Sequence, residues 1–141
     1  MSSKLTIADY PLAETRSAEI KGQRGKSLDE ITLDSVLKGE TKMEDLRITP
    51  KALFDQAELS RAAGRPTLAL NFERAAELVD VPQDFIMSAY ELLRPGRAKS
   101  KEQLLDVAHA FRETYKAPRM ADFVEEAAEI YERRGVFTRR Y

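Results

Sequence analysis

"NFERAAELVDVPQDFIMSAYELLRPGR", from Asn71 to Arg97, contains two helical patterns joined by a short turn. Pro82 stands where the second helix would begin, and the Pro95-Gly96 pair stands where it would end. The helix after Pro82 is apolar over more than half of its circumference, so several of its sides need to be covered. The pattern fits a DNA-reading helix-turn-helix, the lining of an active site, or a docking surface for another protein.

The rest of the chain after residue 26 carries the same kind of helical signal. Residues that favour helix starts and stops recur along it, and they are Ser27, Gly39, Thr49, Pro50, Gly64, Ser100, Pro118 and Gly135. Apolar seams with helical spacing are Leu68, Phe72, Ala75 and Val79, and then Leu104, Ala108, Phe111 and Tyr115. Because no stretch alternates apolar and polar residues as a strand does, we predict a compact all-α domain of about six helices, two of them short, over residues 27–141.

Residues 1–26 show neither a helical nor a strand period. Within them, Tyr10, Pro11 and Leu12 offer apolar surface on a backbone that the proline should hold extended. The segment is either a frayed tail or an extended N-terminal arm that lies on a partner. The predicted organisation is thus an arm over 1–26 followed by the helical domain.

Composition excludes several classes of function. The 141 residues include 23 basic and 24 acidic side chains, and a net charge of −1 provides no field that would attract nucleic acid or an anionic membrane. Cysteine is absent, which excludes disulfides and thiolate chemistry and suits a reducing compartment. No apolar run approaches the ~20 residues of a membrane span, and the N-terminus lacks the apolar core of a signal peptide. We expect a cytoplasmic protein with neither nucleic acid nor membrane as a partner.

The sequence offers no convincing set of catalytic side chains. His109 is the only histidine, and the helical wheel places it opposite the apolar seam, among acidic residues. The last helix carries a run of carboxylates, but they lie on its solvated face, where nothing would raise their pKa. "KGQRGKS", from Lys21 to Ser27, lacks the glycine spacing of a phosphate-binding loop. We therefore expect no catalytic, cofactor-binding or metal-binding residue in this chain.

The apolar excess favours docking over DNA reading. A recognition helix needs exposed Arg, Lys, Asn or Gln on its first turns, whereas residues 82–93 contain no Lys or Arg and carry Asp84 in their first turn. We expect Phe85–Leu93 and the arginines after it to form the main contact with a partner, assisted by the N-terminal arm. The predicted interface residues are Tyr10, Pro11, Leu12, Leu70, Arg74, Leu78, Phe85, Tyr90, Arg94 and Arg97.

Five blocks of the sequence resemble those of a known protein family. "DYPLA", "LDEITLDSVLKGE", "NFERAAEL", "YELLRPGRAKSKEQLL" and "FVEEAAEIYERR" resemble, in this order, the small subunit of adenosylcobalamin-dependent glycerol and diol dehydratases. The resemblance extends from about Asp9 to Arg134. It departs at Gly96, where the family usually carries an aromatic residue.

The resemblance implies a lyase of large, medium and small subunits, assembled as a dimer of heterotrimers. Such an enzyme dehydrates glycerol, 1,2-propanediol or ethanediol to the aldehyde by a radical mechanism. Substrate and metal ion would lie in the barrel of the large subunit, and adenosylcobalamin between the large and medium subunits. The small subunit would pack on the large one and supply no catalytic group.

Two further expectations accompany this resemblance. The family blocks begin within about nine residues of the N-terminus, too few for the three-turn helix that docks some relatives inside a protein shell, so we expect a free cytosolic enzyme. The alternative function is a free helical protein-binding or regulatory module without enzyme activity.

Overall fold

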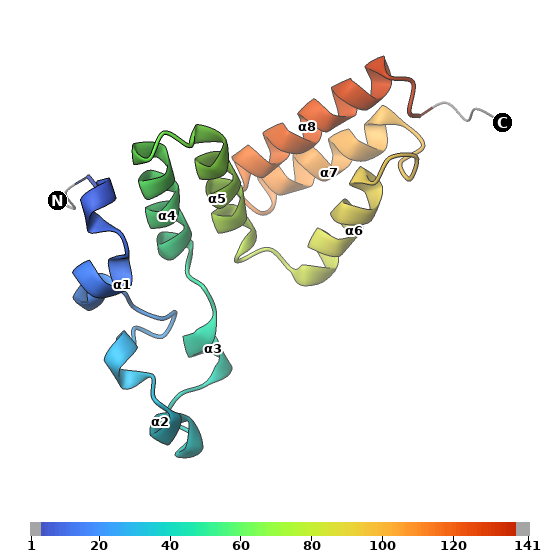
Figure 1. Ribbon diagram of the computed structural model, residues 1–141. Helices are drawn as coiled ribbons and strands as arrows, with labels where there is room; N and C mark the ends of the chain where they lie inside the picture. Colours follow the sequence, from blue (N-terminus) through green and yellow to red (C-terminus); the bar gives the residue numbers. More distant parts are fainter. Residues whose placement is uncertain (1–3, 138–141) are drawn as a thin grey trace. The chain divides into compact units, whose positions relative to one another are not determined.

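The computed structural model describes residues 4–137 and is all-α (Figure 1). Within this range no β-strand forms, and Lys21 and Ser27 make one isolated bridge. The prediction of an all-α fold is confirmed. The first three and last four residues, which include the start of the predicted arm and the end of the predicted helical domain, lie outside the described residues.

The helices fall into a short class and a long class. The short elements come first, and they are η1 (Ile7–Asp9), α1 (Leu12–Thr15), η2 (Ser17–Glu19), η3 (Leu28–Glu30), α2 (Leu33–Leu37) and α3 (Met43–Leu46). The long helices follow as α4 (Pro50–Ala62), α5 (Pro66–Leu78), α6 (Gln83–Leu93), α7 (Lys101–Glu113) and α8 (Pro118–Arg133). The described residues form more helices than the six expected, because helices of one turn are too short to produce a recognisable period in the sequence.

Local sequence signals explain where the long helices begin. Thr49 Oγ1 accepts a hydrogen bond of 3.1 Å from the N–H of Ala52, and Pro50 is the first helical residue. Ser100 likewise caps α7 by accepting from the N–H of Gln103. The helix start expected at Ser27 also forms, as a capping box with Glu30, but it begins only the single turn η3. Thr32 then caps α2 separately.

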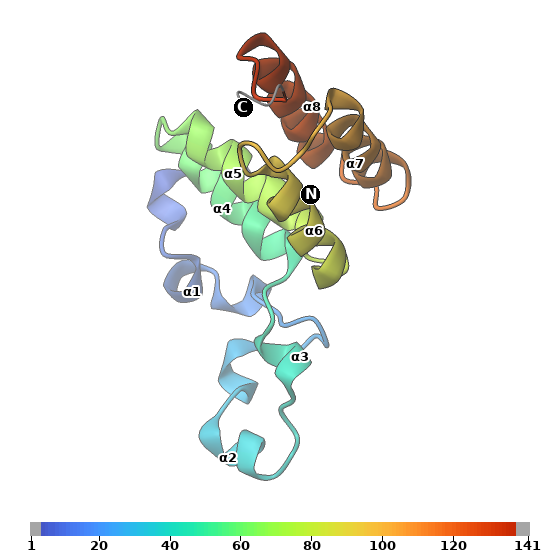
Figure 2. The ribbon, with the colours of Figure 1, turned by 90° about the vertical axis from the view of Figure 1, so that its right-hand side faces the viewer.

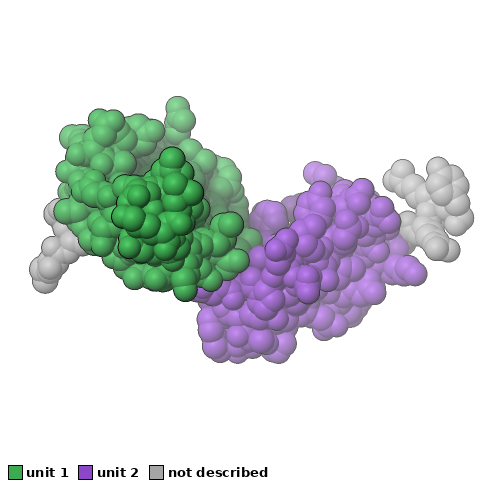
Figure 3. Space-filling view, turned by 90° about the horizontal axis from the view of Figure 1, so that it is seen from below, with its two compact units in different colours: residues 1–79 green, residues 80–141 purple. Residues whose placement is uncertain are grey.

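By their contacts, the residues group into two compact units, 1–79 and 80–141 (Figure 3). The boundary predicted at residue 26 separates an arm that would lie on a partner from the helical domain. Contacts within the chain do not test it, so it stays a prediction. Within unit 1, α4 and α5 pack side by side (Figures 1 and 2). Figure 2 also shows α2 and α3 lying away from this pair.

The core seam predicted for α5 is wrong by one position. Leu68 is 38% exposed, whereas Ala69, Glu73 and Ala76 form the buried line that faces α4. Two alanines let the helices approach closely, and Glu73 is tolerated there because Arg61 pairs with it at 2.8 Å. The larger side chains of α5 are consequently displaced toward its flanks.

The N-terminal segment is held on α4 by a small apolar cluster. Leu5, Leu12 and Leu59 are buried together, and Ile20 packs against them. The backbone is extended at Tyr10 and Pro11, joined by a cis peptide bond, and turns helical on either side. The predicted extended conformation thus holds for these two residues only, since the flanking sequence closes short helical turns.

Unit 2 is built on α7 and α8. The predicted seam of α7 is confirmed, since Leu104, Ala108 and Phe111 are fully buried and Tyr115 is partly buried. Helix α6 packs on α7 through Phe85, whose ring centroid lies 5.0 Å from that of Phe111 and 4.7 Å from that of Tyr115. This aromatic cluster fixes which side of α6 faces inward.

Candidate subunit interface

Helix α6 has an apolar outer side as well as an inner one. Met87 and Tyr90 are half or more exposed, while Ala89 is buried. Met87 and Tyr90 are three residues apart, so they lie on the same side of the helix, and Arg94 follows its last residue. The predicted residue Phe85, by contrast, is half-buried in the aromatic cluster. The exposed apolar side of α6 is therefore centred on Tyr90.

The end of α6 is positioned by α8. The Tyr131 hydroxyl donates a hydrogen bond to the carbonyl of Leu93, the last residue of α6. Arg94 then leaves the helix with an extended backbone, and its guanidinium lies 3.3 Å from a carboxylate oxygen of Glu91. Arg97 is exposed at the end of the turn, in which Gly96 has a positive φ of 80°. Both arginines are exposed in the isolated chain.

The predicted residues of α5 lie in unit 1. Leu70 is exposed, and Leu78 is half-buried. The Arg74 guanidinium donates a hydrogen bond to Asn71 Oδ1, one turn earlier on the same helix. Leu70 and Arg74 are four residues apart and so share one side of α5.

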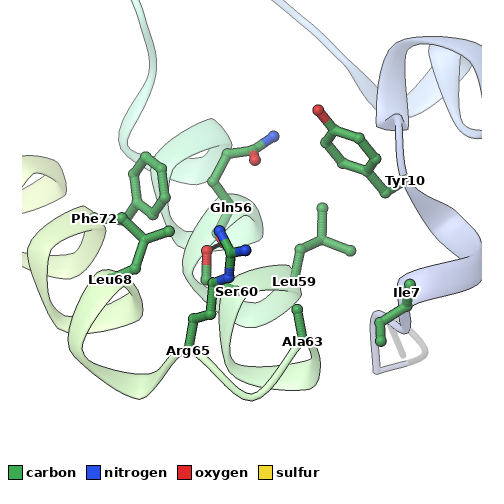
Figure 4. Close-up of a pocket in the computed structure, with 9 residues that line it drawn as sticks. All are labelled: Ile7, Tyr10, Gln56, Leu59, Ser60, Ala63, Arg65, Leu68 and Phe72. Carbon is green, nitrogen blue, oxygen red and sulfur yellow. Dashed lines mark hydrogen bonds between the residues drawn. The ribbon is translucent and has the colours of Figure 1, made fainter.

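Tyr10 borders a groove of about 410 Å³ between the N-terminal segment and the α4–α5 pair (Figure 4). Tyr10 is 64% exposed and its neighbour Pro11 half-buried, whereas Leu12 belongs to the chain's own core. Figure 4 shows Tyr10 facing α4, with Leu68 and Phe72 of α5 at the opposite wall. The groove is lined by Ile7, Tyr10, Gln56, Leu59, Ser60, Ala63, Arg65, Leu68 and Phe72.

Several charged side chains of unit 2 form surface ion pairs. Arg112 on α7 contacts Asp122 at 2.8 Å and Glu125 at 2.9 Å, which ties α7 to α8. Lys101 pairs with Glu132 at 2.7 Å, and this hydrogen bond raises the pKa of Lys101. The carboxylates of α8 are partly solvated, as expected, but two of them are also held by Arg112. Such pairs do not create the desolvated acid–base arrangement that catalysis needs.

His109 lies exposed on α7, where the sequence placed it. Within residues 4–137, no group of three or more His, Asp or Glu side chains is arranged to hold a metal ion. The described helices also include none with the length and apolar character needed to cross a membrane.

Comparison with known proteins identifies the family. The family model for the dehydratase small subunit matches residues 5–138. The propanediol dehydratase small subunit of Salmonella typhimurium strain LT2 is 45% identical over 130 residues, covering 92% of this chain and 75% of that protein. The propanediol dehydratase small subunit of Citrobacter freundii is 45% identical over 125 residues, covering 89% and 72% respectively. The chain belongs to the dehydratase small-subunit family.

Proposed function

We propose that this chain is the non-catalytic small subunit of a dehydratase complex that acts on 1,2-propanediol or a closely related diol. The observation that carries the proposal is 45% identity, over 92% of the chain, to a propanediol dehydratase small subunit. The reaction removes water from a 1,2-diol and leaves the aldehyde, so that 1,2-propanediol yields propanal. Glycerol and ethanediol are the alternative substrates.

The complex would contain a large catalytic barrel subunit and a medium subunit, with two such heterotrimers in the assembly. Adenosylcobalamin, the source of the radical chemistry, would be bound by these other subunits. No step of the reaction is assigned to residues of this chain. A cytoplasmic location is part of the proposal, and the cysteine-free composition of this chain is compatible with a reducing compartment.

The role of this chain is then to pack on the large subunit. Exposed apolar and aromatic side chains with an arginine beside them are typical of residues that contribute strongly to binding. Tyr90 and Arg94 have this character on α6, and Leu70 and Arg74 have it on α5. Tyr10 would add the contact of the N-terminal arm.

Co-expression of this chain with tagged large and medium subunits tests the proposal. We expect the chain to co-purify with the tagged large subunit and the complex to dehydrate 1,2-propanediol when adenosylcobalamin is supplied. Omitting the chain should lower the recovery of soluble, active complex. Substitutions in this chain should leave the relative rates with propanediol, glycerol and ethanediol unchanged. Failure to co-purify would refute the proposal and favour a free helical binding module.

A further inference from the structure

Residues 28–48 place polar side chains inside and apolar side chains outside. Between Lys21 and Ile48 the buried side chains are Ser35, Thr41 and Asp45, and all the apolar ones are exposed or only partly buried. A water-soluble chain normally buries its apolar side chains and exposes its polar ones. A buried polar group or a large exposed apolar patch is therefore an informative exception to this rule. We call the exposed part of this segment the apolar lobe.

The apolar lobe consists of seven large side chains that are between 40% and 78% exposed. They are Leu28, Leu33, Val36, Leu37, Met43, Leu46 and Ile48. On α2 the apolar residues recur at i, i+3 and i+4, and on α3 at i and i+3, so each short helix directs one apolar side outward. Ser35 and Asp45, on the opposite sides of these helices, face inward.

Polar contacts hold this arrangement together. The hydroxyls of Ser35 and Thr41 are hydrogen-bonded at 2.6 Å. Asp45 Oδ2 accepts 2.8 Å bonds from the backbone N–H of Lys42 and from the Arg24 guanidinium. A Cβ added to Gly22 would come within 2.9 Å of the Asp45 carbonyl oxygen, so the loop before η3 packs closely on α3. The shape of the segment therefore does not depend on its apolar side chains packing together.

We propose that the apolar lobe is buried against the large subunit of the dehydratase, an inference that rests on the proposed function. The largest apolar patch of an ordinary monomer covers about 300–600 Å², and each partner in a standard interface buries about 800 Å². Seven side chains at these exposures supply an apolar area comparable with one partner's share of a standard interface, and permanent interfaces are the more apolar class. Asp34 on α2 pairs at 2.7 Å with Lys38 at the C-terminal end of the helix, so α2 presents no net positive charge that would match an anionic lipid surface.

The double variant Leu33→Asp/Leu37→Asp tests the proposal in the co-expressed complex. Both side chains are exposed in the free chain, so its helical circular dichroism should be preserved. The matched control Asp34→Asn/Lys38→Gln alters the two paired charges of the same helix. We expect the apolar variant to reduce the small subunit retained on the tagged large subunit by about tenfold or more, and the control to leave it unchanged.

The outcomes distinguish this inference from the proposed function. If the unmodified complex forms and the apolar variant assembles equally well, the inference fails and the proposed function stands. If the unmodified chain never binds the large subunit, both fail. Loss of self-association in sedimentation, with assembly of the complex unaffected, would assign the lobe to a second copy of this chain and overturn the inference.

A second measurement does not depend on weakening the complex. Because the chain contains no cysteine, the variants Leu37→Cys and Glu129→Cys each carry a single reactive thiol. Mass spectrometry of this chain measures how fast each thiol is alkylated. In the free chain, the two thiols should be alkylated at similar rates. In the complex, we expect the rate at position 37 to fall by about tenfold or more, since a thiol in an interface core is desolvated. Equal reactivity at position 37 with and without the large subunit would contradict the inference.

Discussion

Replacing Tyr90 by alanine should weaken assembly without unfolding the chain. Tyr90 is 57% exposed, so its own unit does not depend on it for burial. A buried aromatic side chain covers ~150–250 Å², which leaves about 100 Å² of this one for a partner to cover. At ~25 cal/mol per Å², Tyr90→Ala should cost about 2.5 kcal/mol of binding free energy, or roughly seventyfold in Kd. Titration of labelled small subunit into the large–medium complex measures this change directly.

Glu129→Ala is the matched control, because Glu129 is exposed on the acidic side of α8. Glu125 is unsuitable as a control, since it accepts a 2.9 Å hydrogen bond from Arg112. Circular dichroism should show the same helical signal for both variants. The reasoning is refuted if Tyr90→Ala binds as tightly as the unmodified chain while Glu129→Ala does not. We also expect Tyr90→Ala to weaken assembly less than the double substitution in the apolar lobe, because that lobe exposes more apolar surface.

Three further outcomes are expected. Phe111 is 1% exposed, so Phe111→Ala should lower the free energy of unfolding by about 3–5 kcal/mol, measurable by urea denaturation of the isolated chain. The Thr6 N–H and the Arg16 guanidinium hold the pKa of Asp9 below its ordinary value. The stabilisation from ionised Asp9 should thus be complete above pH ~4 and be lost as the pH falls through the lowered pKa. The amide resonance of Thr6 should follow this titration, and Asp9→Asn should abolish the change. Finally, the isolated chain should neither dehydrate diols nor retain adenosylcobalamin in equilibrium dialysis, and stoichiometric binding would contradict this.

The long helices were predictable because their signals are strong and local. Thr49, Pro50 and Pro118 begin helices by mechanisms that act within one turn, so tertiary structure has little chance to override them. The seam of α7 was predicted correctly because its large apolar residues are the ones that are buried. In α5 the same rule failed, since close packing selected Ala69 and Ala76 and displaced the larger residues.

The candidate interface was predictable only in part. Sequence identified α6 as too apolar for its surroundings, but it could not say that Phe85 faces inward and Tyr90 outward. That division follows from the aromatic cluster with Phe111 and Tyr115, which brings together residues far apart in the chain. Leu12 was likewise assigned to an interface although it packs with Leu5 and Leu59. Helical periodicity shows that a face is apolar, and only the tertiary contacts show what covers it.

The apolar lobe illustrates the same limit in its sharpest form. The spacing of Leu33, Val36 and Leu37 is typical of a helix whose apolar side faces the core of its own chain. The structure instead directs that side outward and stabilises the segment through Ser35, Thr41 and Asp45. In a chain that is always assembled with partners, some apolar residues pack against another subunit and not against the chain's own core. Their helical spacing in the sequence does not show which of the two covers them. An apolar helical face that its own chain does not cover is therefore the feature to test first for a subunit contact, and in this chain such faces lie on α2 and α3 as well as on α6.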